Sequence, residues 1–265
     1  MMVWSIFTKK NGLTLIELLI ALVLSSILIA ALFRTFISQQ KNYTVQDQVA
    51  EMQQNVRVAI GQMTKEIRMA GYGGDLAIFG DVNGFSNIIT PASKSITIIL
   101  ADEVGALKQN VAMGTNQLKV TNAKVFNTDK KKYLCLNGSN HYLVQSITGD
   151  TIILTTPLAE GHPVNEPIYL VKAISYDLGI RDGRTFLRRN ENTGGGAQPL
   201  AENIENLQLI YFDKNGDETT NPTDIRMVQV TVTAKTGMLD LGYKGRNGYR
   251  RRTLSTHIRV RNLGT

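Results

Sequence analysis

The spacing of hydrophobic positions changes along the chain and separates two kinds of helix. Residues 13–33 are almost continuously apolar and contain no Gly or Pro, so they predict a helix long enough to cross a bilayer. Apolar residues then recur at steps of three and four, which predicts an amphipathic helix with one buried face. The expected buried face consists of Val45, Val49, Met52, Val56, Ile60, Met63 and Ile67. The expected polar face consists of Gln46, Asp47, Gln48, Glu51, Gln54, Arg57, Lys65 and Glu66.

The two patterns join into one predicted helix over residues 13–70, of which residues 13–33 span the membrane. No helix breaker lies between the apolar run and Gly61, and the first proline after the run is Pro91. The stretch AGYGG at 70–74 supplies glycines suited to ending a helix.

Beyond residue 85 the pattern is strand-like. The predicted strands are 95–100, 117–122, 141–147, 151–156, 167–177, 185–189, 207–213, 225–235 and 254–261. Two hairpins are expected, around Gly149-Asp150 and around Arg181-Asp182-Gly183, and the stretch LAENIEN at 200–206 predicts a helical turn. Because no helix-length crossover separates the strands, their pairing should be antiparallel. The predicted fold is therefore α+β, a long N-terminal helix packed on an antiparallel β-rich domain of residues 75–265.

The amino-acid composition adds little to the prediction of fold and function. The chain has 265 residues, 43% hydrophobic and 19% charged, which is ordinary for a globular protein with one apolar segment. Its net charge of +7 is too mild to indicate nucleic acid by itself. The single cysteine, Cys135, cannot form an intramolecular disulfide, and we expect it to be a small core residue.

The apolar run contains one charged residue, Glu17, and is preceded by Lys9 and Lys10. The two lysines predict that the N-terminal end stays in the cytoplasm and that the rest of the chain is exported. A carboxylate inside a membrane helix costs up to about 3 kcal/mol, so Glu17 indicates a function that a plain signal anchor does not explain. A secretory signal peptide would instead be cut after the run, near Ala30 and Ala31.

The stretch KKNGLTLIELLIAL resembles the processing signal of type IV pilins and of the pseudopilins of type II secretion. The resemblance implies that residues 1–12 are a leader cut after Gly12 by a prepilin peptidase. It also implies that the new N-terminal residue, Leu13, is N-methylated, although Phe is usual there. Glu17 then occupies the fifth position of the mature chain, where the family has Glu.

The resemblance gives Glu17 a role as a docking residue. It implies that the carboxylate pairs with the Leu13 amino group of a neighbouring subunit as helices stack into a filament. The expected partners are other minor and major pilins, the peptidase and methylase, and the inner-membrane assembly platform. The expected location is the inner membrane, with the C-terminal domain in the periplasm, followed by incorporation into the pilus.

The C-terminal part suggests a branch of this family. The stretches LAENIENLQLIYFDKNGDE, IRMVQVTVTAKTG and YRRRTLSTHIRVRN resemble PilW-type minor pilins, which initiate or cap filaments, and also the related J-type minor pseudopilins. A membrane-anchored periplasmic binding module is a further alternative. We expect no enzyme activity, no cofactor and no small-molecule substrate, since no Gly-x-Ser-x-Gly elbow or phosphate-cradling loop occurs.

Three further groups of residues are candidate sites. Asp213, Asn215 and Asp217 alternate like the start of a calcium loop, but a turn between strands explains them better. The histidines, at 141, 162 and 257, lack ligand-like spacing. Basic residues with interleaved Tyr243 and Tyr249 favour solvated surface or a subunit interface over nucleic acid. This basic group comprises Lys244, Arg246, Arg250, Arg251, Arg252, Arg259 and Arg261.

Overall fold

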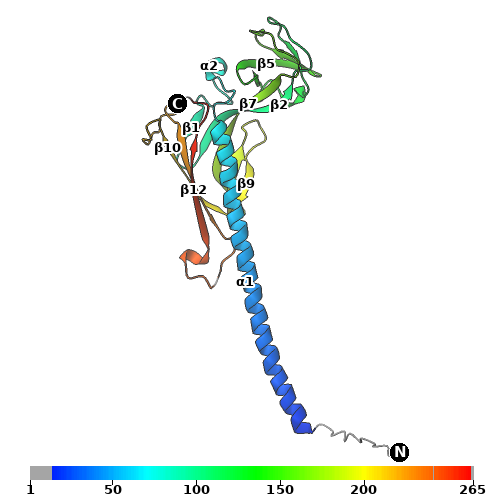
Figure 1. Cartoon of the computed structure of the whole chain (residues 1–265), viewed down its shortest axis with the longest axis vertical. Helices are drawn as coiled ribbons and strands as arrows, with labels where there is room; N and C mark the ends of the chain where they lie inside the picture. The colour runs from blue at the N-terminus through cyan, green and yellow to red at the C-terminus, as the bar shows by residue number, and fades with distance from the viewer. Residues whose placement is uncertain (1–13, 241, 264–265) are drawn as a thin grey trace, which may run out of the picture. The chain divides into compact units, whose positions relative to one another are not determined.

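The computed structural model describes residues 14–240 and 242–263. Gly12 and Leu13, the predicted cleavage and methylation positions, lie outside the described residues. The chain divides into two compact units, Met1–Val49 and Ala50–Thr265. The boundary falls within helix α1 (Leu15–Met69), so this helix contributes residues to both units (Figure 1).

The part of α1 in the second unit buries the apolar face that the spacing predicted. Met52, Val56, Ile60, Met63 and Ile67 are buried, together with Ala59. One position of the predicted polar face was wrong: Glu66 is only 8% exposed. It follows Met63 by three residues, so it lies on the same side of the helix and faces the protein interior.

The glycine-rich stretch ends the helix as expected. Gly71 has a φ of +86° and donates its backbone N–H to the carbonyl of Ile99. The last carbonyls of a helix lack partners within it, and here the C-terminal segment supplies them. The backbone N–H of Arg261 donates to the carbonyl of Arg68, and Asn262 Nδ2 donates to the carbonyl of Met69.

The remaining elements are a short helix, two 3₁₀ turns and β-strands. They are α2 (Leu76–Phe79), β1 (Ile89–Pro91), β2 (Ile96–Ala106), β3 (Gln117–Lys119), η1 (Ala123–Val125), β4 (Tyr133–Leu136), β5 (Asn140–Thr148), β6 (Thr151–Leu154), β7 (Pro167–Arg181), β8 (Arg184–Asn190), β9 (Gln198–Glu202), β10 (Ile204–Phe212), β11 (Met227–Lys235), η2 (Arg246–Gly248) and β12 (Arg251–Arg259).

All nine predicted strands are present, and β1, β4 and β9 were not predicted. Both hairpins are confirmed; in the second, Asp182 and Gly183 have positive φ, as a two-residue turn with the twist of the strands requires. The helical turn predicted at 200–206 was wrong. Its residues instead belong to β9 and β10, which meet at Asn203 with a φ of +57°.

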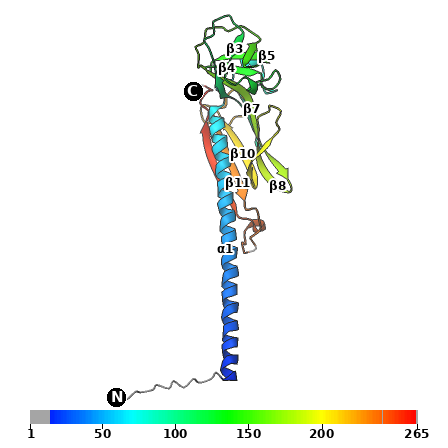
Figure 2. The ribbon, with the colours of Figure 1, turned by 90° about the vertical axis from the view of Figure 1, so that its right-hand side faces the viewer.

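Every pairing between the described strands is antiparallel, as expected. One sheet has the order β1-β2-β7-β4-β5-β6-β3, with β8 added to β7 and β9 added to β8 (Figure 2). The other sheet has the order β10-β11-β12. Tyr211 of β10 joins the two sheets, because its hydroxyl donates to the carbonyl of Ala92 beside β1.

Residues 96–101 of strand β2 are buried on both faces, which explains why this part of the strand is almost continuously apolar. Ile99 and Ala101 pack with Cys135, Val171 and Phe79 in one cluster. Cys135 is thus a core residue, as predicted, and burial raises the pKa of its thiol to about 12. The fold is α+β: a long N-terminal helix packed against antiparallel sheets.

Candidate functional site: the first turn of the N-terminal helix

The candidate docking residue, Glu17, lies in the first turn of α1. Thr14 precedes the helix, and its carbonyl accepts the first helical hydrogen bond, from the N–H of Leu18. Thr14 is therefore the N-cap residue, and Glu17 stands three positions later, which is the spacing of a capping box.

The capping box is formed in both directions. Thr14 donates both its backbone N–H and its hydroxyl to Glu17 Oε2, each over 2.9 Å. The N–H of Glu17 in turn donates to Thr14 Oγ1 over 3.4 Å. Within the described residues nothing donates to the other carboxylate oxygen, Oε1. The carboxylate is thus held in one orientation while one oxygen can still accept a cation or a hydrogen-bond donor.

The residues on both sides of Glu17 present apolar side chains in the first unit. Within the described part of the chain, α1 is the one helix whose length and composition would allow it to cross a membrane. The large apolar side chains of residues 15–37 of this helix are exposed. They are Leu15, Ile16, Leu18, Leu19, Ile20, Leu22, Val23, Leu24, Ile27, Leu28, Ile29, Leu32, Phe33, Phe36 and Ile37.

The hydroxyl groups of this segment are satisfied by the helix itself. Ser26 donates to the carbonyl of Leu22 over 2.8 Å, and Thr35 donates to that of Ala31 over 3.1 Å. Because polar groups inside a bilayer need internal partners, neither hydroxyl requires a contact with another chain. Glu17 differs, since its charge has no cation nearby among the described residues of this chain.

Asp213, Asn215 and Asp217 form a turn after β10. Asp213 Oδ1 accepts the backbone N–H groups of Asn215 and Asp217 over 2.8 and 3.0 Å. The arrangement satisfies the turn's own backbone donors. Among the described residues, no group of three or more His, Cys, Asp or Glu side chains is placed to hold a metal ion.

The three histidines lie in separate environments. His162 is buried with its Nδ1 atom 3.0 Å from Glu166 Oε1. Burial lowers the pKa of His141, whose ring packs edge-on against Phe79. His257 lies beside Phe212 on the three-stranded sheet.

The basic group predicted as one cluster is divided by strand β12. Arg250 pairs with Asp240 over 2.9 Å at one end, and Arg251 pairs with Glu205 over 2.6 Å. Arg259 lies at the other end of the strand, about 26 Å away at 3.3 Å per residue. The group is therefore not one continuous basic surface.

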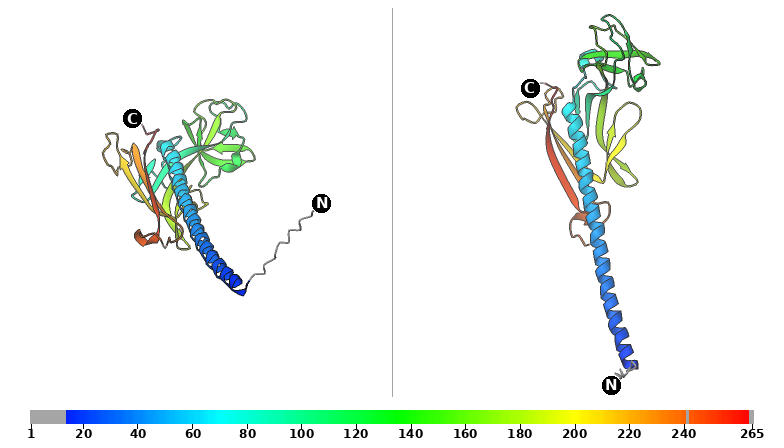
Figure 3. Two further views of the ribbon diagram at one scale, coloured as in Figure 1. Left: turned by 60° about the horizontal axis from the view of Figure 1, so that its bottom comes forward. Right: turned by 45° about the vertical axis from the view of Figure 1, so that its right-hand side comes forward.

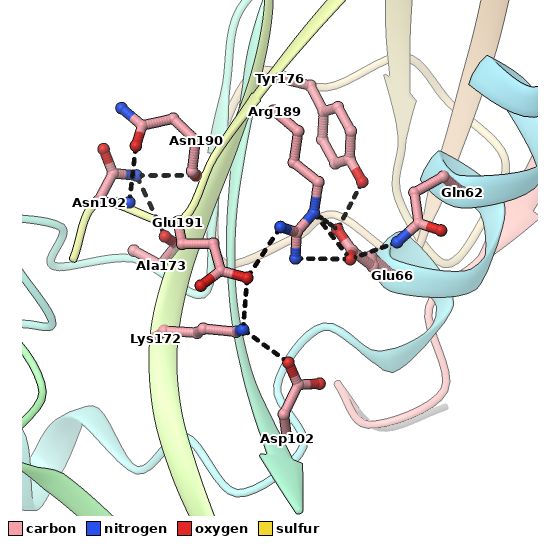
Figure 4. A network of polar contacts seen from close by, with 10 residues as sticks. All are labelled: Gln62, Glu66, Asp102, Lys172, Ala173, Tyr176, Arg189, Asn190, Glu191 and Asn192. Carbon is pink, nitrogen blue, oxygen red and sulfur yellow. Dashed lines mark hydrogen bonds and ion pairs between the residues drawn. The ribbon is translucent and has the colours of Figure 1, made fainter. Parts of the chain in front are cut away.

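A polar network that was not predicted joins α1 to the large sheet (Figure 4). Glu66 accepts hydrogen bonds from the Tyr176 hydroxyl and from Arg189, whose Nη2 atom lies 2.9 Å from Glu66 Oε1. Gln62 donates to the same oxygen over 2.7 Å. Arg189 also donates to Glu191 over 2.8 Å, which extends the network to the residue that follows β8.

The network continues to β2 through a buried lysine. Lys172 Nζ lies 2.7 Å from Glu191 Oε1 and 2.7 Å from Asp102 Oδ2. Burial alone would raise the pKa of Glu191, but the bonds from Lys172 and Arg189 hold it below its usual value. Because its positive and negative charges alternate, we assign this network a structural role. Glu66 was predicted to lie on the polar face of the helix, although its position three residues after Met63 is a local signal that it is buried.

Comparison with known proteins adds one finding. A family model described as the prokaryotic N-terminal methylation motif matches residues 7–33. No curated protein and no solved structure matches the chain. The matched range contains Gly12, Leu13 and Glu17, whereas the β-rich unit lies outside it. The motif and the apolar helix fit a membrane-anchored protein, and the chain carries the N-terminal methylation motif of type IV pilin-like precursors.

Proposed function

We propose that the protein is a minor pilin of PilW type, which helps to initiate or cap a type IV pilus. The observation that carries this proposal is the methylation motif over residues 7–33, in which Gly12 and Glu17 have the spacing of a prepilin signal. The exposed apolar side chains of residues 15–37 support it, because such a surface suits a bilayer first and the helices of other subunits later.

Processing precedes assembly. A prepilin peptidase on the cytoplasmic face cuts after Gly12, and the new amino group of Leu13 is methylated. Lys9 and Lys10 keep the leader in the cytoplasm, so the β-rich unit reaches the periplasm. The chain then waits in the inner membrane and acts by assembly rather than by catalysis.

Glu17 is the docking residue of the mature subunit. Its carboxylate pairs with the cationic amino group of Leu13 on a neighbouring subunit, while the helices pack through residues 13–40. Opposite charges attract more strongly between packed helices, where water is excluded, than they do in bulk water. The capping box supports this role, because Thr14 orients the carboxylate and leaves Oε1 able to accept the incoming amine.

Deleting the gene should distinguish a pilus subunit from the alternative, a minor pseudopilin of type II secretion. We expect surface pili, counted by electron microscopy, to fall sharply, since an initiating subunit is needed for each filament. Secretion of folded enzymes through the type II system should stay normal, and reintroducing the intact gene should restore the pili. Normal pili with failed secretion would contradict the minor pilin and favour the pseudopilin.

A further inference from the structure

The connection between β11 and β12 combines exposed apolar side chains with basic ones. Met238 is 64% exposed, Leu239 55% and Tyr243 38%. Residues 235–252 contain six Lys and Arg residues and a single acid, Asp240. Exposed apolar groups beside several cations are typical of surfaces that meet another molecule rather than bulk water.

The loop is held by its own hydrogen bonds. The N–H of Thr236 donates to the carbonyl of Arg250, and the N–H of Asp240 donates to that of Gly248, both over 2.9 Å. The carboxylate of Asp240 is buried and accepts from Arg250. The one acid of the loop is therefore engaged inside it.

Two cations of this region remain available. Lys244 and Arg252 are exposed, and no carboxylate among the described residues pairs with either of them. We use the term loop patch for Met238, Leu239, Tyr243, Lys244 and Arg252. The loop patch thus presents three apolar side chains and two positive charges that no carboxylate of the described residues pairs with.

The loop patch lies at a defined end of the second unit. Strand β12 runs from Arg251 to Arg259. Beyond the strand, the backbone N–H of Arg261 donates to the carbonyl of Arg68 in the last turn of α1. Figure 3 shows β12 running alongside the part of α1 that belongs to the second unit. The loop therefore lies at the end of the second unit opposite Arg68, where α1 enters this unit at Ala50.

We propose that the loop patch contacts the anionic phospholipid surface of the membrane in which residues 15–37 are anchored. The apolar side chains enter the headgroup region while Lys244 and Arg252 bind phosphate groups, which is the arrangement of interfacial membrane-binding segments. The apolar helix of another subunit is the competing occupant. Its residues 15–33 offer one carboxylate, Glu17, so it matches the apolar part of the patch but not the two cations.

A fluorescent label on the full chain tests this contact. Met238→Cys would carry an environment-sensitive dye, and Cys135 would not compete because it is buried. The protein is reconstituted, at a low protein-to-lipid ratio, in vesicles of phosphatidylcholine alone or mixed with phosphatidylglycerol. We expect the dye to shift to the blue and to be quenched by brominated lipids only with phosphatidylglycerol. High salt should weaken the signal.

Two comparisons make the test specific. Lys244→Gln with Arg252→Gln should weaken the contact about thirty-fold, since each cation near an anionic surface contributes roughly fivefold. Met113→Cys is the matched control, because Met113 is also an exposed loop methionine of the second unit, 72% exposed. A dye there should show no shift.

Several results would overturn the proposal. Absence of lipid quenching in anionic vesicles is one, and an equal response at position 113 is another, since it would indicate general adsorption. A signal that appears in neutral vesicles and grows with protein concentration would assign the loop patch to a neighbouring subunit instead. The measurement needs no filament, so its failure would leave the pilin proposal intact.

Discussion

Glu17→Val is expected to leave leader cleavage intact and to abolish incorporation of the subunit into filaments. The peptidase site lies before Leu13, so it does not require the carboxylate. Docking loses the attraction between the carboxylate and the cationic amino group of the neighbouring subunit, and the substitution leaves that amino group without a counterion. The measurement is an immunoblot of membrane and sheared-pilus fractions, in which mature protein should accumulate in the membrane.

Two controls separate charge from other effects of the substitution. Glu17→Gln keeps an oxygen that can accept from Thr14 but removes the charge, so it should fail as Glu17→Val does. Glu51→Gln removes an exposed acid from the same helix and should assemble normally. Unchanged filament numbers with Glu17→Val, or an equal loss with Glu51→Gln, would contradict the docking role.

Breaking the contact between Glu66 and Arg189 is expected to cost about 3–5 kcal/mol of the free energy of unfolding. The side chain of Glu66 is 10% exposed and that of Arg189 21% exposed. Removing Arg189 leaves the Glu66 carboxylate without its cation. Removing Glu66 leaves Arg189 with Glu191 alone and takes away the acceptor of the buried Tyr176 hydroxyl. Glu66→Ala should therefore lower the urea midpoint of the full chain in detergent micelles, measured by circular dichroism of the β-rich unit.

The neighbouring residue supplies a matched control. Arg188 pairs with Asp177 over 2.6 Å, but both side chains are about 40% exposed, so Arg188→Ala should cost at most about 1 kcal/mol. Replacing Glu66 and Arg189 together by leucine should recover part of the loss, because no unpaired charge then remains. Equal costs for Arg188→Ala and Glu66→Ala would show that burial does not set the strength of this contact.

Local periodicity accounts for the parts of the fold that the sequence predicted. The apolar stripe of α1 and the strands on either side of Gly149 follow from spacings of three to four and of two residues. The helical turn predicted at 200–206 was wrong because that prediction also used only the local pattern. Its pattern is local, whereas pairing of β9 with β8 and of β10 with β11 decides the conformation.

The features that the sequence did not predict depend on the positions of residues in space rather than on local pattern. Glu66 meets Tyr176 and Arg189 across 110 and 123 positions of sequence, so no local pattern could pair them. The basic group looked continuous because its members are close in sequence, yet an extended strand separates Arg251 from Arg259. Glu17, by contrast, was found because its signal, a lone acid in an apolar run, is entirely local.

Intact-mass analysis of the protein purified from membranes tests the central claim most directly, with cells lacking the prepilin peptidase as the comparison. The account predicts a mature chain that begins at N-methylated Leu13 in normal cells and an uncut chain in the comparison. A chain that still begins at Met1 in normal cells, or one that has been cut after Ala30, would contradict it.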